Sequence, residues 1–260
     1  MCLILVAWRV HPGYPLVVAA NRDEFFVRPT APTAFWQDAP QVLAGRDLEA
    51  GGTWMGVTRN GRFAALTNFR DPAQNLSNAP SRGSLVADFL VGDEAPQTYL
   101  ERIASRARQC NGYNLLVSDG DTLWWSSNMG GEARPLTPGV YGVSNHLLDT
   151  PWPKVGAGKT ALAQALDCLP DEQGLFALLR DDYIHPDEQL PQTGVSLDWE
   201  RLLSSAFIKS PGYGTRSSTV VCMGQNGWTS FDEQTWLPGA EFGQRLRYRF
   251  MSPANRLIAP

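Results

Sequence analysis

The residues best suited to chemistry lie near the start of the chain, where MCLILVAW is followed by LVVAANRDEFF. Cys2 directly follows Met1, and its small side chain allows methionine aminopeptidase to remove that methionine. Cys2 would then carry both a thiol and a free α-amino group, whose pKa is ordinarily roughly 7.7–8.0. Because a neutral amine can take the proton of an attacking thiol, this residue is a candidate N-terminal nucleophile.

A polar cluster, Asn21, Arg22, Asp23 and Glu24, ends the second apolar run. It supplies the groups that a catalytic thiol needs: a carboxylate to orient the amine, a cation to favour the thiolate and an amide to bind an oxyanion. Side-chain alternation along a strand puts Asn21 and Asp23 on one face and Arg22 on the other. All three side chains therefore cannot point at one sulfur atom.

A predicted hairpin would bring this cluster to Cys2. Residues 2–8 and 16–20 are apolar runs, and the HPGYP segment between them has the composition of a turn. In an antiparallel hairpin, the end of the second strand lies beside the start of the first. We therefore expect the polar cluster to lie close to the thiol.

The other predicted elements form blocks of strands, helices and strands. Residues 28–53 contain several prolines and a Gly-Gly pair with little periodicity, which favours a long ordered loop. The order of strands, helices and strands predicts an α+β protein with antiparallel sheets under segregated helices. We expect one domain, 1–260, in which the N-terminal and C-terminal strands are neighbours in one sheet. The predicted strands are WMGVT, RFAALTN, YNLLVSDG, TLWWSS, 140–144, TRSSTVVC, GWTSFD and QRLRYRF, and the predicted helices are 85–91, APQTYLERIASRARQ, 157–168, 171–181 and 198–207.

Composition excludes several classes of function. The chain has 260 residues, 43% of them hydrophobic, a formal net charge of −4 and no basic run, which argues against a nucleic-acid partner. We find neither an apolar stretch of about 18 residues nor a signal-peptide pattern, so we expect a cytoplasmic protein without a membrane span. The four cysteines lie far apart without a CxxC pair, so neither a metal site nor a disulfide framework is indicated.

Several sequence blocks resemble one family. MCL, AANRDEFF, GGTWMGV, ALTNFR, GYNLLV, GVSNHLLDTPWPKV and YGTRSSTV, in this order, are similar to those of the NRDE family, also named the transport-and-Golgi-organisation protein 2 family. The resemblance spans nearly the whole chain. It implies a fold like that of the N-terminal-nucleophile (Ntn) hydrolases, a four-layer αββα sandwich similar to penicillin V acylases and bile-salt hydrolases.

The same resemblance implies roles for particular residues. Cys2 matches the nucleophile, Asp23 the acid that orients the amine, Asn145 the later oxyanion-binding Asn, and Arg216 the late Arg near the nucleophile. Arg22 directly precedes Asp23, whereas the hydrolases separate their Arg and Asp by two residues. Further candidates for substrate binding lie at predicted strand ends or in loops: Asn21, Asn68, Asn114, Trp54 and His146.

Two functions are consistent with these residues. The first is a cysteine amidohydrolase or acyl-transfer enzyme acting on a small amide or acyl substrate, a hydrolase of C–N bonds other than peptide bonds that requires neither metal nor cofactor. The second is a non-catalytic carrier of haem or an acyl-CoA-like amphiphile, because the family is described in terms of haem mobilisation and lipid metabolism. In that case His146 is the candidate axial ligand.

A purely structural interpretation is also open. Free cysteine is among the most buried residue types, so Cys2 can be a small core residue. The charged cluster can be an ion-pair network that closes the hairpin. Asparagine at a strand end commonly bonds loop backbone, which would account for Asn68, Asn114 and Asn145.

Overall fold

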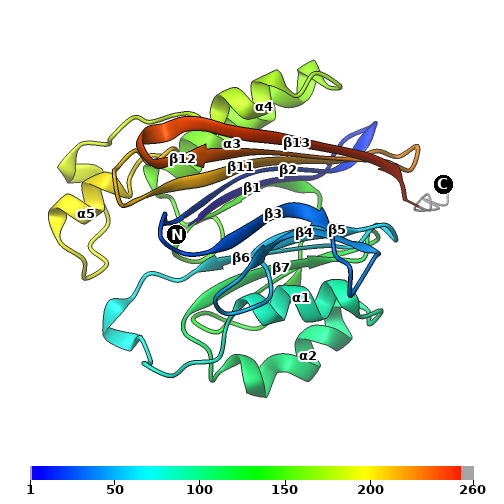
Figure 1. The fold of residues 1–260 in the computed structure, drawn as a ribbon, viewed down its shortest axis with the longest axis horizontal. Coiled ribbons are helices and arrows are strands. Elements are labelled where there is room, and N and C mark those ends of the chain that lie inside the picture. Colours follow the sequence, from blue (N-terminus) through cyan, green and yellow to red (C-terminus); the bar gives the residue numbers. More distant parts are fainter. Residues whose placement is uncertain (1, 253–260) are drawn as a thin grey trace.

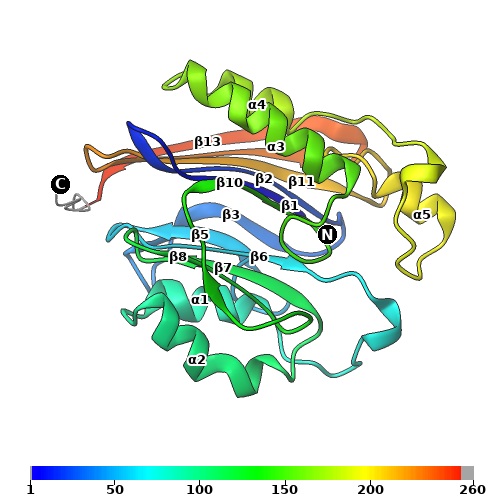
Figure 2. The same ribbon diagram turned by 180° about the vertical axis from the view of Figure 1, so that it is seen from behind.

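The computed structural model describes residues 2–252 and has four layers. Two antiparallel sheets lie face to face, and helices cover the outer face of each (Figure 1). The view from behind shows the same order of layers (Figure 2). The predicted α+β class and αββα arrangement are therefore confirmed. Met1, whose removal the sequence predicts, lies outside the described residues.

The first sheet pairs the two ends of the chain. From edge to edge its strands are β10 (Gly139–Val143), β1 (Cys2–His11), β2 (Tyr14–Phe25), β11 (Tyr213–Met223), β12 (Trp228–Leu237) and β13 (Glu241–Met251). The predicted hairpin is the pair β1 and β2, in which Cys2 lies opposite Arg22 and Leu3 opposite Asn21. The predicted neighbourhood of the N-terminal and C-terminal strands is confirmed, because β2 pairs with β11.

The second sheet contains the middle of the chain. In spatial order its strands are β3 (Thr30–Phe35), β4 (Val42–Asp47), β5 (Met55–Thr58), β6 (Phe63–Asn68), β7 (Tyr113–Ser118), β8 (Leu123–Ser127) and β9 (Arg134–Pro135). The expected loop over 28–53 is therefore wrong, since β3 and β4 lie inside it. The prolines in this segment count as evidence against strands. However, β3 is an edge strand, where a residue without a backbone N–H, such as Pro32, is tolerated.

The helices lie outside the sheets. α1 (Gly83–Val91) and α2 (Pro96–Ala107) cover the second sheet, and α3 (Pro153–Ala165) and α4 (Gln173–Leu178) cover the first (Figures 1 and 2). α5 (Leu197–Leu202) lies at the end of the sandwich where β1 begins (Figure 1). The helix predicted over 198–207 is thus shorter than expected, and the one predicted from 157 begins at Pro153, a residue well suited to a first helical turn. Within residues 2–252, no helix combines the length and apolar content of a bilayer span.

Alternation along β1 divides the core into layers. Ile4, Val6 and Trp8 belong to the apolar cluster between the sheets, whereas Leu3 and Leu5 pack toward α3 and α4. Cys2 lies two residues before Ile4 on the same strand, so its side chain is on the face between the sheets. The fold therefore directs the thiol into the interior of the sandwich at one end of the strand.

Candidate functional site

Cys2 opens onto a cavity between the two sheets. Its side chain is 7% exposed and lines a hollow of about 510 Å³. Strands of both sheets contribute to the lining, among them β2, β3, β4 and β11. The thiol is thus buried but still reachable from the cavity.

Asp23 lies next to the thiol and lines the same cavity. It is 1% exposed, and its Oδ1 accepts a hydrogen bond from Thr215 Oγ1 at 2.7 Å. A hydrogen bond from the Asp23 backbone also reaches the Cys2 sulfur. The structure therefore brings the thiol and this aspartate together through the predicted hairpin.

Burial governs the protonation of both groups. It raises the pKa of the Cys2 thiol above the ordinary 9.0, although the positive charge of Arg22 and the hydrogen bond from the Asp23 backbone lower it in part. Burial also raises the pKa of Asp23, against the opposing effects of the Lys154 charge and the Thr215 hydrogen bond. At neutral pH the resting thiol is protonated, so any nucleophilic role requires a base.

Lys154 contributes a second buried charge near the thiol. Its Nζ donates to the Leu203 carbonyl at 2.8 Å, and burial lowers its pKa to about 8 while the charge of Asp23 raises it. Lys154 was not among the predicted site residues. Its position at the start of a helix gave no sign that it would be buried.

The cavity is lined by charged side chains of both signs. Within residues 2–252, five arginines and four carboxyl groups belong to the lining. Two of the arginines are bound by carboxylates: Arg28 by Asp47 at 2.8 Å, and Arg46 by Asp38 at 2.8 Å. The other three, Arg22, Arg82 and Arg216, make no ion pair shorter than 3.9 Å among the described residues.

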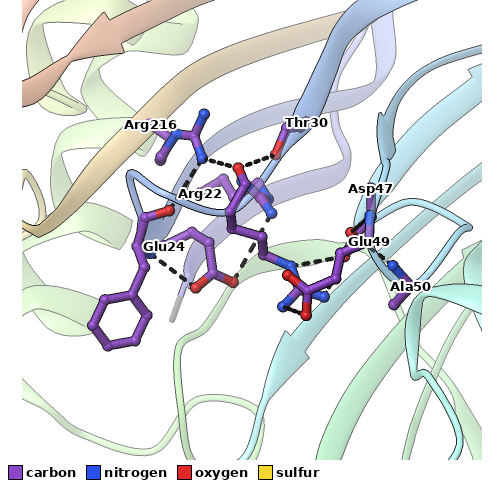
Figure 3. Close-up of polar contacts among 9 residues, drawn as sticks. Arg22, Glu24, Thr30, Asp47, Glu49, Ala50 and Arg216 are labelled. Carbon is purple, nitrogen blue, oxygen red and sulfur yellow. Dashed lines mark hydrogen bonds and ion pairs between the residues drawn. The ribbon is translucent and has the colours of Figure 1, made fainter.

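Arg22 and Arg82 line the cavity from different elements, strand β2 and the segment before α1. Arg22 is the cross-strand partner of Cys2 and lies 3.9 Å from the Glu24 carboxylate (Figure 3). Arg82, just before α1, donates to the Gly112 carbonyl at 3.0 Å. Burial lowers the pKa of Arg82, while the charge on Cys2 raises it. Both cations are therefore close enough to influence a thiolate.

Arg216 has a structural role at the edge of the cavity. The register of β11 shifts between Thr215 and Ser217, so Arg216 is the extra residue of a bulge. Its Nη1 donates to the carbonyls of Phe25 at 3.1 Å and Arg28 at 2.7 Å (Figure 3). Arg216 thus fixes the connection from β2 to β3 at the edge of the cavity.

Asn68 and Asn145 occupy different positions relative to the cavity. Asn68 lines it together with Trp54, another predicted residue. Asn145 does not belong to the lining, and its Nδ2 donates to the Asn68 carbonyl at 2.9 Å. Its neighbour Ser144 donates to the Cys2 carbonyl at 3.0 Å. Asn145 therefore links the ends of β6 and β10, and of these two asparagines it is Asn68 that lines the cavity.

Asn21 lies outside the cavity lining. Its amide nitrogen donates to the carbonyls of Leu179 and Ala206, both at 2.8 Å, and its oxygen accepts from Ser218 Oγ at 2.6 Å. These contacts tie β2 to the helical layer. The opposite facing of Asn21 and Arg22 follows the expected alternation.

Asn114 and His146 also lie outside the lining. The Asn114 amide nitrogen donates to Thr67 Oγ1 at 3.1 Å and to the His146 carbonyl at 2.8 Å. His146 Nδ1 shares a hydrogen bond of 2.8 Å with Thr150 Oγ1, and its ring lies 4.8 Å from that of Phe69. Local polar contacts thus occupy both side chains away from the thiol.

Removal of the Arg22 charge should slow alkylation of the thiol. We expect Arg22→Gln to raise the pKa of Cys2 further, and so to lower the rate of reaction with iodoacetamide at pH 8 by about three- to tenfold. The difference should vanish well above the thiol pKa, where both proteins carry a thiolate. Peptide mapping in a Cys168→Ser background gives the rate, because Cys168 is exposed.

Arg46→Gln is the matched control for this prediction. It removes the same charge from the cavity at a residue bound to Asp38. An equal loss of rate in both variants would show that Arg22 has no particular effect on the thiol.

Comparison with known proteins identifies relatives along most of the chain. The family model described as Transport and Golgi organisation 2 matches residues 1–238. The Transport and Golgi organization protein 2 homolog of Bos taurus is 37% identical over 264 residues, covering 91% of this chain and 94% of the relative. The homolog of Homo sapiens is 35% identical over 261 residues, with the same coverage. The Drosophila melanogaster protein is 29% identical over 267 residues, covering 90% of this chain and 92% of the relative.

The comparison with solved structures includes two other proteins. A mutant conjugated bile acid hydrolase from Clostridium perfringens has a TM-score of 0.46 and 9% identity, covering 99% of this chain and 100% of that one. A Caenorhabditis elegans ortholog of N-acylethanolamine-hydrolyzing acid amidase has a TM-score of 0.46 and 12% identity, covering 84% of this chain and 92% of that one.

Proposed function

This chain belongs to the Transport and Golgi organisation 2 family, and we propose that it is a cysteine-dependent amidohydrolase or acyl-transfer enzyme acting on a small amide or acyl substrate. The observation that carries the proposal is the position of the Cys2 thiol, which opens onto a 510 Å³ cavity that Asp23, Arg22 and Arg82 also line. A cavity of this size can enclose a small organic molecule. A cysteine with only a structural role would not require such surroundings.

The proposed reaction begins after removal of Met1. The α-amino group of Cys2 takes the thiol proton while the sulfur attacks the substrate carbonyl carbon, and the carbonyl electron pair moves onto the oxygen. When the tetrahedral intermediate collapses, the C–N bond breaks and the ammonium returns its proton to the departing amine. Water, deprotonated by the same α-amino group, then attacks the thioester, releasing a carboxylic acid and restoring the thiol.

The surrounding residues support these steps. Asp23 accepts a hydrogen bond from the α-amino group and so orients its lone pair toward the thiol. The Asn68 amide stabilises the developing oxyanion, because it is the predicted donor that faces the cavity. Arg22 and Arg82 favour the thiolate, and their remaining donors suit a substrate carboxylate. Asn145 holds the backbone of Asn68.

The arginines also favour a second candidate, a carrier of an anionic amphiphile. Haem propionates or the phosphates of an acyl-CoA-like molecule would suit the cationic lining. Among residues 2–252 the lining contains no histidine, so haem iron would have only the Cys2 thiolate as a candidate ligand. A carrier of this kind binds its ligand without forming an acyl-enzyme on Cys2.

Blocking the α-amino group tests the enzymatic proposal. We expect a chain with an added leucine between Met1 and Cys2 to retain Met1 and to lose at least about 100-fold in the hydrolysis rate of p-nitrophenyl acetate, since general-base catalysis contributes at least that factor. The comparison protein starts at Cys2 after proteolytic removal of a leader. Equal rates in the two proteins would refute the role of the amine.

A further inference from the structure

A row of side chains runs across the first sheet from the thiol. Cys2 pairs with Arg22, Arg22 with Ser217, and Ser217 with Thr235. Cross-strand partners share a face of the sheet, and so do Thr235 and Glu233, which are two residues apart. All five residues line the cavity. The cavity therefore extends over four neighbouring strands, from the thiol at one end to Glu233 at the other.

Strand geometry gives the length of this row. Neighbouring strands are about 4.8 Å apart, so the three steps from β1 to β12 cover roughly 14 Å. Glu233 lies about 7 Å further along β12 than Thr235, which puts its backbone roughly 16 Å from that of Cys2. A ligand that reaches from one backbone position to the other must therefore be elongated.

Glu233 lies at a position where the strand pattern favours an apolar residue. Phe231, two residues earlier on the same face, belongs to the core between the sheets. Glu233 is 5% exposed, and its Oε1 accepts a hydrogen bond from the Thr33 backbone amide at 3.1 Å. Because Thr33 belongs to β3, the carboxyl group connects the two sheets at this end of the cavity.

Glu233 differs from two other carboxyl groups of the lining. Glu24 has Arg22 within 3.9 Å, and Asp47 is bound by Arg28 at 2.8 Å. Among the described residues, Glu233 makes no ion pair within 4.0 Å. Burial raises its pKa, whereas hydrogen bonds from Thr33, the charge of Arg22 and a hydrogen bond from Ser217 lower it in part. Glu233 is thus a buried carboxyl group without an ion pair among the described residues, at the opposite end of the row from the thiol.

We propose that Glu233 is a specificity-determining residue, which accepts a hydrogen bond from a hydroxyl or ammonium group that the substrate carries roughly 16 Å from the carbonyl attacked by Cys2. The inference rests on the proposed function and adds the class of substrate: an elongated amide or acyl compound with a distal hydrogen-bond donor. A site built around a buried acceptor rejects analogues that lack the donor, because the acceptor then remains without that bond.

Affinity labels of graded length test the proposal. Linear N-alkyl chloroacetamides ending in a methyl, hydroxyl or ammonium group would alkylate Cys2 in the Cys168→Ser protein. The measured quantity is the Cys2 alkylation rate of each label divided by that of iodoacetamide. For labels that span roughly 16 Å, we expect a hydroxyl or ammonium end to raise this ratio about tenfold over a methyl end, as one hydrogen bond to a charged group provides. Shorter labels should show no such preference.

Variants of two glutamates complete the experiment. Glu233→Gln keeps an oxygen for the Thr33 amide but loses the negative charge, so the preference for ammonium should disappear. Glu241→Gln, which removes the same charge from an exposed residue of β13, should retain it. The absence of any end-group preference while iodoacetamide still labels Cys2 would overturn the role of Glu233 alone. A Cys2 that iodoacetamide cannot reach would overturn both this role and the proposed function.

Discussion

Cys2→Ala is expected to reduce the hydrolysis of p-nitrophenyl acetate by about 1,000-fold or more, because the variant lacks the atom that attacks the carbonyl. The fold should survive, since alanine fits a buried position at the start of β1. Initial rates of p-nitrophenol release measure the loss, and circular dichroism with thermal unfolding measures the fold.

The matched control is Cys110→Ala, which removes another buried thiol. Cys110 belongs to the core between α2 and the second sheet and is not among the residues that line the cavity. This control should keep the full rate. If Cys2→Ala also kept it, Cys2 would not be the nucleophile.

Glu200→Ala is expected to lower the free energy of unfolding by about 3–5 kcal/mol, which makes it the largest effect on stability that we predict. Glu200 on α5 and Arg70 after β6 form an ion pair of 2.6 Å, and their side chains are only 4% and 2% exposed. The other Glu200 oxygen accepts from the Thr193 amide at 2.8 Å. Alanine removes all these contacts and leaves the Arg70 charge buried without this carboxylate. Urea denaturation measures the change.

Arg201→Ala in the same helix is the control for stability. Arg201 binds Asp187 at 2.7 Å, but the two side chains are 42% and 44% exposed. Exposed pairs contribute at most about 1 kcal/mol. Losses of similar size in Glu200→Ala and Arg201→Ala would contradict the importance of burial at the Arg70 pair.

The hairpin that forms the site could be predicted because its signals are local. Apolar runs flank a proline and glycine turn, and the polar cluster follows the second run. The strand itself continues through the cluster to Phe25, further than its apolar residues extend. Pairing with β11 on the other side of β2 explains this extension, and no local pattern could reveal it.

Several residues that line the cavity were not predicted, because they belong to elements far from Cys2 in the sequence. Arg28 and Arg82 lie in connections whose path depends on the packing of the two sheets. Glu233 could have been noticed in the sequence, because a carboxyl group two residues after Phe231 falls on the same face of β12 as that core residue. For Asn114 the structural interpretation describes the observed contact, because its amide bonds the backbone of the segment after β10. His146 bonds a threonine of the same segment.

The most direct test of the central claim is the intact mass of the freshly made protein after brief incubation with p-nitrophenyl acetate, with peptide fragmentation to locate the adduct. A chain that lacks Met1 and carries one hydroxylamine-sensitive acetyl group on the sulfur of Cys2 is the predicted result. Retention of Met1, or a Cys2 that stays unmodified while p-nitrophenol is released, would contradict the claim.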